Sequence, residues 1–286
     1  MALVMLMIIF RYQTPDLYLL HSVNQHPVRE KLVLHTHTDA ELYCFLGGKA
    51  TYYVEGTAYP LQPGDIILVR PMEAHNVRID PSAPYERILL NFDAGILSSI
   101  DPENRLMQPF FQRPAGKRNL YRPENGRCLS LLQDMTVPSP EPRLVILGNL
   151  ILLLQQLTQM FCAEQPMADD PDTLESELVR YINKHLDKDL TIQTLCDRFF
   201  ISRAQLCRRF RQAIGTSIGN YITAKRLLLA RQLLWQKQKP TEVFTACGYQ
   251  DYSAFYRAYL NYFGHSPSDE QRFNYALAPE DRISIE

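Results

Sequence analysis

The 286-residue sequence lacks the motifs that define several common classes of enzyme and secreted protein. It has no P-loop, no glycine-rich dinucleotide-binding motif and no Ser-His-Asp spacing, so nucleotide-dependent and triad chemistry find no support. Its six cysteines, at positions 44, 128, 162, 196, 207 and 247, include no CxxC pair and no regular spacing. Nothing in that spacing indicates a disulfide framework, and we expect a cytoplasmic protein with reduced thiols.

An uninterrupted hydrophobic run of membrane-spanning length is also missing. The apolar N-terminal stretch, MALVMLMIIF at residues 1–10, is shorter than the roughly 20 residues that span a bilayer. It lacks the basic region and the small-residue cleavage site of a signal peptide. We therefore expect no membrane partner, and we predict that this stretch forms an early strand covering the N-terminal domain.

The charges nearly cancel over the whole chain but are unevenly distributed. The formal net charge is −1. Residues 196–272 carry 12 Lys and Arg against 5 Asp and Glu, a net of +7, whereas residues 1–171 carry 14 against 18, a net of −4. A basic module beside an acidic one is typical of a nucleic-acid-binding protein with a separate sensing or assembly domain.

The basic module contains an internal repeat. The stretch Leu195–Ser217 is echoed by Phe244–Ser266, with three pairs at an offset of 49 residues: Arg208 with Arg257, Phe210 with Tyr259, and Gly215 with Gly264. Each copy reads as a short helix, a tight turn and a second helix with buried anchors four residues apart, ended by glycine. The repeat predicts two helix-turn-helix motifs.

A helix-turn-helix places its second helix in the DNA major groove, so two copies on one chain can read two groove segments. The alternative is that both hairpins are ordinary core helices of an α-helical domain. The segregated positive charge favours double-stranded DNA as the partner.

The residues of this region resemble the AraC/XylS family of bacterial transcription regulators. The resemblance rests on Ser202–Gly215, Tyr221, Arg226, Ala230–Leu234, Gly248, Tyr249, Phe255, Arg257, Tyr259, Gly264, Ser266 and Pro267. It implies a seven-helix DNA-binding domain in which a helix from about Ile218 to Gln236 holds two reading helices apart. Two positions depart from the family pattern: Phe200 stands where a turn glycine is usual, and Phe244 where a small alanine is usual.

Helical periodicity separates buried from DNA-facing positions in each reading helix. In the first, Leu206, Phe210 and Ala213 or Ile214 form the buried stripe. The DNA-facing residues of the first helix are then Arg203, Ala204, Cys207, Arg208 and Arg211, and those of the second are Tyr252, Ser253, Tyr256 and Arg257. Arg208 is predicted to read a guanine, and Arg203 and Arg211 to hold phosphates. Asp251 is predicted to cap the second reading helix. The family resemblance also implies that this second helix contacts RNA polymerase.

The first half of the chain has a strand pattern. Short apolar runs alternate with turn signals at Leu42–Leu46, Ala50–Val54, Ile66–Val69 and Ile88–Phe92, which indicates a β-barrel or sandwich. His35, His37, Glu41, Gly48, Gly64 and His75 resemble the two motifs of the cupin fold. We expect His35 and His37 to lie two apart on one strand and, with Glu41 and His75, to bind a small-molecule effector, such as a sugar, without any cofactor. The same four residues are the candidate ligands should the site hold iron, manganese, zinc or nickel.

A helix is predicted between the two halves. In Arg143–Phe161, the apolar residues Leu147, Leu150 or Ile151, Leu154, and Leu157 or Thr158 recur at helical spacing. The surplus of leucine leaves two alternatives open: pairing with a second copy in a homodimer, as the resemblance implies, or burial within one chain. The following residues, CAEQPMADDPD, read as a linker.

The fold class predicted is therefore a two-domain α+β chain. It consists of a cupin-like effector-binding β-barrel at 1–140, a helical segment with a dimerisation role at 141–165, a linker at 166–173, and an AraC-type DNA-binding domain with two helix-turn-helix motifs at 174–275. The predicted function is sequence-specific DNA binding and transcription regulation in response to a small molecule. The alternative function is a metal-dependent cupin enzyme with an appended DNA-binding domain.

Overall fold

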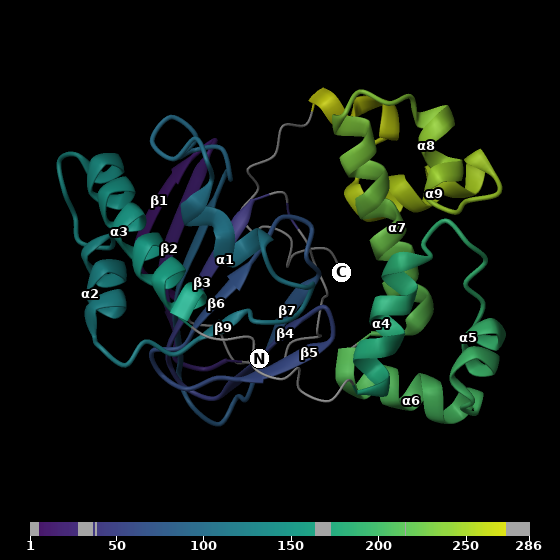
Figure 1. Ribbon diagram of the computed structural model, residues 1–286, viewed down its shortest axis with the longest axis horizontal. Helices are drawn as coiled ribbons and strands as arrows, with labels where there is room; N and C mark the ends of the chain where they lie inside the picture. Colours follow the sequence, from purple (N-terminus) through teal and green to yellow (C-terminus); the bar gives the residue numbers. More distant parts are fainter. Residues whose placement is uncertain (1–5, 28–36, 38, 164–172, 215, 273–286) are drawn as a thin grey trace. The chain divides into compact units, whose positions relative to one another are not determined.

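The structure is a computed structural model that describes residues 6–27, 37, 39–163, 173–214 and 216–272 (Figure 1). The described residues divide into two compact units, the first within residues 6–163 and the second within residues 173–272. His35 lies outside the described residues, as do residues 164–172, which include most of the predicted linker.

The strands of the first unit form two antiparallel sheets. They are β1 (Leu6–Thr14), β2 (Leu17–Asn24), β3 (Ala40–Gly47), β4 (Ala50–Val54), β5 (Thr57–Pro60), β6 (Ile66–Val69), β7 (His75–Ile79), β8 (Tyr85–Phe92) and β9 (Leu120–Tyr121). The larger sheet has the order β1-β2-β8-β3-β6-β9, and the smaller sheet the order β5-β4-β7. All four apolar runs that predicted strands are confirmed as strands or parts of them.

The central strands of the larger sheet are buried on both faces, which explains their continuous apolar sequences. In β3, Leu42 and Cys44 join one hydrophobic cluster, while Tyr43 and Phe45 join the other. The second cluster includes Tyr52 of β4, so it fills the space between the two sheets. The unit is therefore a β-sandwich whose interior lies between the sheets.

Helices cover the outer face of the larger sheet (Figure 1). They are η1 (Arg105–Met107), α1 (Gln108–Phe111), α2 (Arg127–Asp134) and α3 (Pro142–Ala163). The predicted helix at Arg143–Phe161 is confirmed as α3, and it buries Ile146, Leu150, Leu153, Leu154, Leu157 and Phe161. By length and composition α3 could cross a membrane, but one side of it packs in the hydrophobic core of this unit.

One strand prediction needs correction, and another is confirmed only in part. We expected His35 and His37 to lie on one strand. His37 lies in the segment before β3 and not on a strand, so the prediction is wrong for His37, and His35 lies outside the described residues. β1 is confirmed as a strand at the edge of the larger sheet, where Phe10 and Tyr12 pack against the hydrophobic core, but Leu6, Met7, Ile8 and Ile9 are exposed.

The second unit is helical. Its elements are α4 (Leu174–Lys184), α5 (Ile192–Phe199), α6 (Arg203–Ile214), α7 (Ile218–Trp235), α8 (Pro240–Ala246), α9 (Tyr252–Phe263) and the 3₁₀ helix η2 (Pro267–Arg272). Side chains cap several helix starts: Thr173, Thr191, Ser217 and Asp251 each accept a hydrogen bond from a backbone N–H of the first turn. The predicted N-cap role of Asp251 is confirmed.

The long helix α7 joins the two helix-turn-helix motifs. At its start Tyr221 packs edge-on against Phe210 of α6, with ring centroids 5.6 Å apart. At its end Leu227, Ala230 and Leu234 share a hydrophobic cluster with Phe255 and Tyr259 of α9. α7 thus belongs to the cores of both motifs, in agreement with the helix that the resemblance implied.

Candidate functional site

The first candidate site is centred on the buried carboxylate of Glu41, between the two sheets. Its Oε2 atom lies 2.8 Å from Nε2 of His37 and 3.4 Å from Nε2 of His75. Its Oε1 atom accepts a hydrogen bond from the hydroxyl of Tyr52. We call these four residues, His37, Glu41, Tyr52 and His75, the Glu41 cluster.

Backbone carbonyls orient both imidazoles toward Glu41. The Nδ1 atom of His37 lies 2.9 Å from the carbonyl oxygen of Asp39, and Nδ1 of His75 lies 2.8 Å from that of Glu73. Because a carbonyl can only accept, each Nδ1 carries the hydrogen, and Nε2 of each ring points into the cluster.

Electrostatics favour an ionised Glu41. Burial alone would raise the pKa of Glu41, but the charge of His75 and hydrogen bonds from both histidines outweigh burial and hold that pKa well below its ordinary value. Burial alone would lower the pKa of His75, yet the Glu41 carboxylate raises it. Burial, together with the charge of Glu41, raises the pKa of Tyr52 well above its ordinary value, so its hydroxyl remains a donor.

Further polar groups line the same interior. Asn91 of β8 pairs in register with Glu41 on one side and Tyr18 on the other, so its side chain shares their face of the sheet. Asn91 is only 4% exposed, and its Oδ1 atom has no hydrogen-bond partner among the described residues. A buried carbonyl oxygen without a partner is a position where a bound molecule can donate a hydrogen bond.

The structure brings together three of the four residues predicted for this site. His37, Glu41 and His75 offer one ligand atom each, all within 4.8 Å of one another. Two imidazole nitrogens whose Nδ1–H groups are anchored, together with a carboxylate, fit a divalent transition metal. They equally fit the polar wall of a small-molecule pocket, and the fourth residue, His35, is outside the described residues.

Sequence reasoning missed Tyr52 and Asn91. Tyr52 lies in the middle of a correctly predicted strand. It is two residues before the apolar Val54, and residues two apart on a strand face the same side, so the sequence indicated an inward-facing position for Tyr52. Asn91 lies at the end of a buried run, where a polar residue among apolar ones was the available signal.

The second candidate site is the exposed side of the two reading helices. In α6 the predicted stripe is buried and consists of Leu206, Phe210 and Ile214. The opposite side carries the predicted DNA-facing residues: Arg203, Ala204, Arg208 and Arg211 are exposed, and Cys207 is half-buried. In α9 the anchors Phe255 and Tyr259 are buried, and Ser253, Tyr256 and Arg257 are exposed.

Two residues of this surface differ from expectation. Tyr252 is half-buried, because its ring packs against Phe244 and Phe255, with centroids 5.7 and 5.9 Å away. Its body therefore belongs partly to the core of the second motif instead of facing outward like its neighbours. Arg209, for which the sequence predicted no role, forms an ion pair with Glu175 of α4 in which Nε and Oε1 are 2.6 Å apart.

Comparison with known proteins assigns both units. The AraC-like ligand binding domain family matches residues 24–156, and a helix-turn-helix domain family matches residues 195–272. The Msm operon regulatory protein of Streptococcus mutans serotype c is 23% identical, over 79% of this chain and 82% of the relative. The raffinose operon transcriptional regulatory protein RafR of Pediococcus pentosaceus is 26% identical, over 77% of this chain and 80% of the relative. ToxT from Vibrio cholerae O395 is a structural match at 11% identity with a TM-score of 0.38, covering 92% of this chain and 98% of that chain.

A ligand-binding domain followed by two helix-turn-helix motifs defines a DNA-binding transcription regulator. The chain belongs to the AraC family of these regulators.

Proposed function

We propose that the Glu41 cluster, with Asn91 and with His35 from outside the described residues, binds a small carbohydrate that controls transcription. The observation that carries this proposal is the partnerless Oδ1 of Asn91 beside the Glu41 carboxylate. A sugar offers hydroxyl groups that can donate to both of these acceptors, and tyrosine and histidine rings offer faces and donors for the rest of the molecule. The relative named for a raffinose operon favours the same class of ligand.

A thermal-shift screen of the full chain with raffinose and simpler neutral sugars tests the carbohydrate proposal. A ligand at 100 times its Kd stabilises the folded state by about 2.7 kcal/mol, which corresponds to about 5–10 °C for a unit of this size. Glu41→Gln should remove the shift, whereas Glu103→Gln, at an exposed ion pair with Arg105, should retain it. No shift with any sugar, or an equal shift in Glu41→Gln, would contradict the assignment.

For DNA we propose that α6 and α9 enter successive major grooves, about 34 Å apart. Arg208 reads a base, and Arg203 and Arg211 hold phosphates, with Ala204 and Cys207 allowing close approach. In α9, Tyr252, Ser253, Tyr256 and Arg257 make the second contact, and a DNA-bound chain contacts RNA polymerase. The protein acts in the cytoplasm as a regulator and not as an enzyme.

Salt dependence tests the phosphate role of Arg211. Arg211→Ala should weaken binding to specific and random DNA alike and should lower the slope of log K against log salt by about 0.9. Fluorescence anisotropy titrations between 50 and 200 mM salt measure this slope. A loss confined to the specific site, at an unchanged slope, would assign Arg211 to base reading instead.

We propose a homodimer through the exposed side of α3. Leu144 is 72% exposed and Leu152 is 40% exposed, and they follow one another with Gly148 at intervals of four residues on one helix face. Leu144→Glu with Leu152→Glu should convert dimers to monomers in sedimentation velocity. A chain that is monomeric before the substitutions would refute this proposal.

The competing function is that of a metal-dependent enzyme, which the geometry of His37, Glu41 and His75 keeps open. Such a metal would be held by these three residues and would supply a Lewis acid. Elemental analysis of protein purified without added metal tests whether the site binds a metal, and the absence of stoichiometric metal would end the metal proposal. Stoichiometric iron, zinc, manganese or nickel that is lost in His75→Gln would favour the metal site.

A further inference from the structure

We propose that Arg113 and Arg118 couple the Glu41 cluster to the C-terminal end of α3, from which the chain leads toward the DNA-binding unit. The proposal rests on the proposed function, because it describes how occupancy of the ligand site reaches the rest of the chain. Neither arginine was singled out by the sequence, and neither belongs to the ligand site itself.

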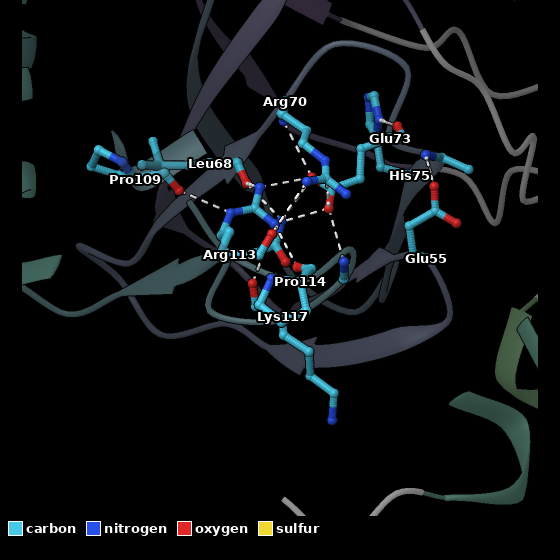
Figure 2. Close-up of polar contacts among 12 residues, drawn as sticks. Glu55, Leu68, Arg70, Glu73, His75, Pro109, Arg113, Pro114 and Lys117 are labelled. Carbon is cyan, nitrogen blue, oxygen red and sulfur yellow. Dashed lines mark hydrogen bonds and ion pairs between the residues drawn. The ribbon is translucent and has the colours of Figure 1, made fainter. Parts of the chain in front are cut away.

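Arg113 forms a buried ion pair with Glu73, two residues before His75. Its two terminal nitrogens lie 2.9 Å and 2.7 Å from the two carboxylate oxygens of Glu73, and both side chains are fully buried. Figure 2 shows the guanidinium group of Arg113 at the centre of further bonds to backbone carbonyls. These carbonyls belong to Leu68, Pro109 and Lys117, at 3.1, 2.9 and 3.2 Å.

On one side this ion pair fixes the backbone that carries His75. The carbonyl oxygen of Glu73 accepts the bond from Nδ1 of His75, so the residue that pairs with Arg113 also orients the imidazole in the Glu41 cluster. The next residue, Ala74, is bound to Glu55 through its N–H at 2.8 Å and through its carbonyl oxygen at 2.8 Å. A shift of His75 therefore acts directly on the backbone of Glu73, whose side chain forms the buried charge pair.

On the other side the segment that carries Arg113 contacts the last turns of α3. A terminal nitrogen of Arg118 donates to the carbonyl oxygen of Phe161 at 2.8 Å, and the guanidinium group lies 4.2 Å from the centre of the Phe161 ring. Phe161 is two residues from the end of α3, where carbonyl oxygens lack intrahelical partners. Arg118 thus acts as a cap for the helix end, with a charge that complements the helix dipole.

These contacts connect His75 in the Glu41 cluster with Phe161 near the end of α3. They run from His75 to Glu73, from Glu73 to Arg113, and through the loop after Arg113, by way of Arg118, to Phe161. A ligand that forms hydrogen bonds with His75 in place of its present ones changes the position of Glu73. The guanidinium group of Arg113 then moves with Glu73, because separating a buried ion pair is costly. The cap on Phe161 is then strengthened or released. The states with and without this cap differ in the position at which α3 ends. A ligand that binds one of these states more tightly shifts the equilibrium toward it and so transmits a signal.

Hydrogen exchange of the full chain, followed by mass spectrometry, tests the coupling without an identified ligand. The perturbation is His75→Gln, and the readout is the exchange rate of the peptide that covers Leu157–Ala163. We expect His75→Gln to change that rate by about fivefold or more. In an Arg118→Gln background, where the cap is already absent, the same substitution should change it by less than about twofold.

Arg122→Gln is the matched control, because Arg122 pairs with Asp65 at the edge of the same unit and lies outside this chain of contacts. In that background the response to His75→Gln should be retained. An unchanged rate at Leu157–Ala163 after His75→Gln, or an undiminished response in Arg118→Gln, would overturn the proposal. Should His75→Gln fail to fold, Glu41→Gln provides the same perturbation from the other side of the cluster.

Failure of the carbohydrate proposal remains separate from failure of the coupling. If no sugar shifts the melting temperature but the exchange response is present and depends on Arg118, the coupling stands and the ligand class is wrong. If raffinose binds, its addition to the wild type and to Arg118→Gln should reproduce the effects of the His75 substitution. Raffinose binding with an equal exchange response in both proteins would overturn the coupling alone.

Discussion

The two helix-turn-helix motifs share a backbone plan but present different surfaces. The N–H of Ile201 bonds to the carbonyl of Cys196, and the N–H of Tyr249 bonds to that of Phe244, so the two turns close in the same way. Each closing bond follows a residue in the left-handed region: Phe200 with φ of 51° and Gly248 with φ of 77°. The equivalence Phe200 to Gly248 has an offset of 48, one less than in the reading helices.

The reading helices differ in charge. α6 carries four arginines over its twelve residues, whereas α9 carries Arg257 alone and exposes neutral rings such as Tyr256 and Tyr262. The first motif can gain affinity from phosphates, and this gain falls with salt. In the proposed complex with DNA, the second motif would depend more on shape and hydrogen bonds, which salt affects less. The proposed interface thus combines a salt-sensitive contact with a largely neutral one.

The turns also differ in what surrounds the left-handed residue. A Cβ atom on Gly248 would lie 2.2 Å from the carbonyl oxygen of Leu186 and 2.8 Å from the guanidinium of Arg226. The ring of Phe200 instead projects into solvent and is 96% exposed. Packing therefore requires glycine in the second turn. In the first turn a side chain meets no clash, and its cost is only the strain of the left-handed backbone conformation.

The largest expected effect is that of Gly248→Ala. Left-handed strain and the clash with Leu186 together should destabilise the second unit by about 2–5 kcal/mol. Urea unfolding of the full chain, followed by helical circular dichroism, measures the loss. Gly264→Ala is the matched control, since φ there is 78° but no atom lies within 4 Å of the new Cβ. It should cost only about 1–2 kcal/mol. Equal losses at both sites would contradict the packing argument.

The next effect is on sequence discrimination. Arg208→Ala should reduce the preference for the specific site by about 1–3 kcal/mol at one base position, because a bidentate contact to guanine is lost. Arg257→Ala, at the corresponding position of α9, should reduce it at a position in the second groove. Anisotropy titrations with single-base variants of the operator locate both positions. If Arg208→Ala weakens specific and random DNA equally, Arg208 holds a phosphate.

Local sequence patterns predicted the elements well because their causes are local. The continuous apolar runs of β3 and β6 follow from burial on two faces, and the spacing of Leu206, Phe210 and Ile214 follows from one buried helix face. The N-cap of Asp251 was likewise visible from its neighbours. Phe200 was recognised as standing at a glycine position, which its positive φ supports.

The site was predicted only in part because its contacts are long-range. Tyr52 bonds to Glu41 from a different sheet, and Asn91 meets Glu41 through strand register although they are 50 positions apart in the sequence. The pair of Glu73 and Arg113 spans 40 residues and has no local signature. Which residues of a strand face the interior can be read from alternation, but which interior residues meet is decided by sheet order and register.

A smaller effect is expected at the first turn. Phe200→Gly should stabilise the second unit by about 1 kcal/mol, because relief of the left-handed strain exceeds the entropy cost of glycine. Phe200→Ala is the control: it keeps the Cβ and removes the exposed ring, so the change should stay within about 0.5 kcal/mol. Urea unfolding measures both. A large loss in Phe200→Ala would mean that the ring packs in solution.

The smallest effect tests the ion pair between Arg209 of the first motif and Glu175 of α4. Arg209 is half exposed and its ion pair is screened by solvent, so Arg209→Gln should have only a small effect on the urea midpoint at neutral pH. Burial alone would raise the pKa of Glu175, but the hydrogen bond from Arg209 outweighs it and lowers that pKa below its ordinary value of 4.5. A depressed carboxyl pKa contributes stability above the unfolded value and loses it as the pH falls through the folded value. The difference between wild type and Arg209→Gln in urea midpoint should therefore be constant from pH 7 to about pH 5 and should shrink below about pH 4.5. Arg211→Gln is the control, because Arg211 lies on the same helix but has no carboxylate partner among the described residues, and it should show no such pH dependence. If the difference in urea midpoint between wild type and Arg209→Gln persists at acid pH, Arg209 stabilises α6 through its packing and not through Glu175.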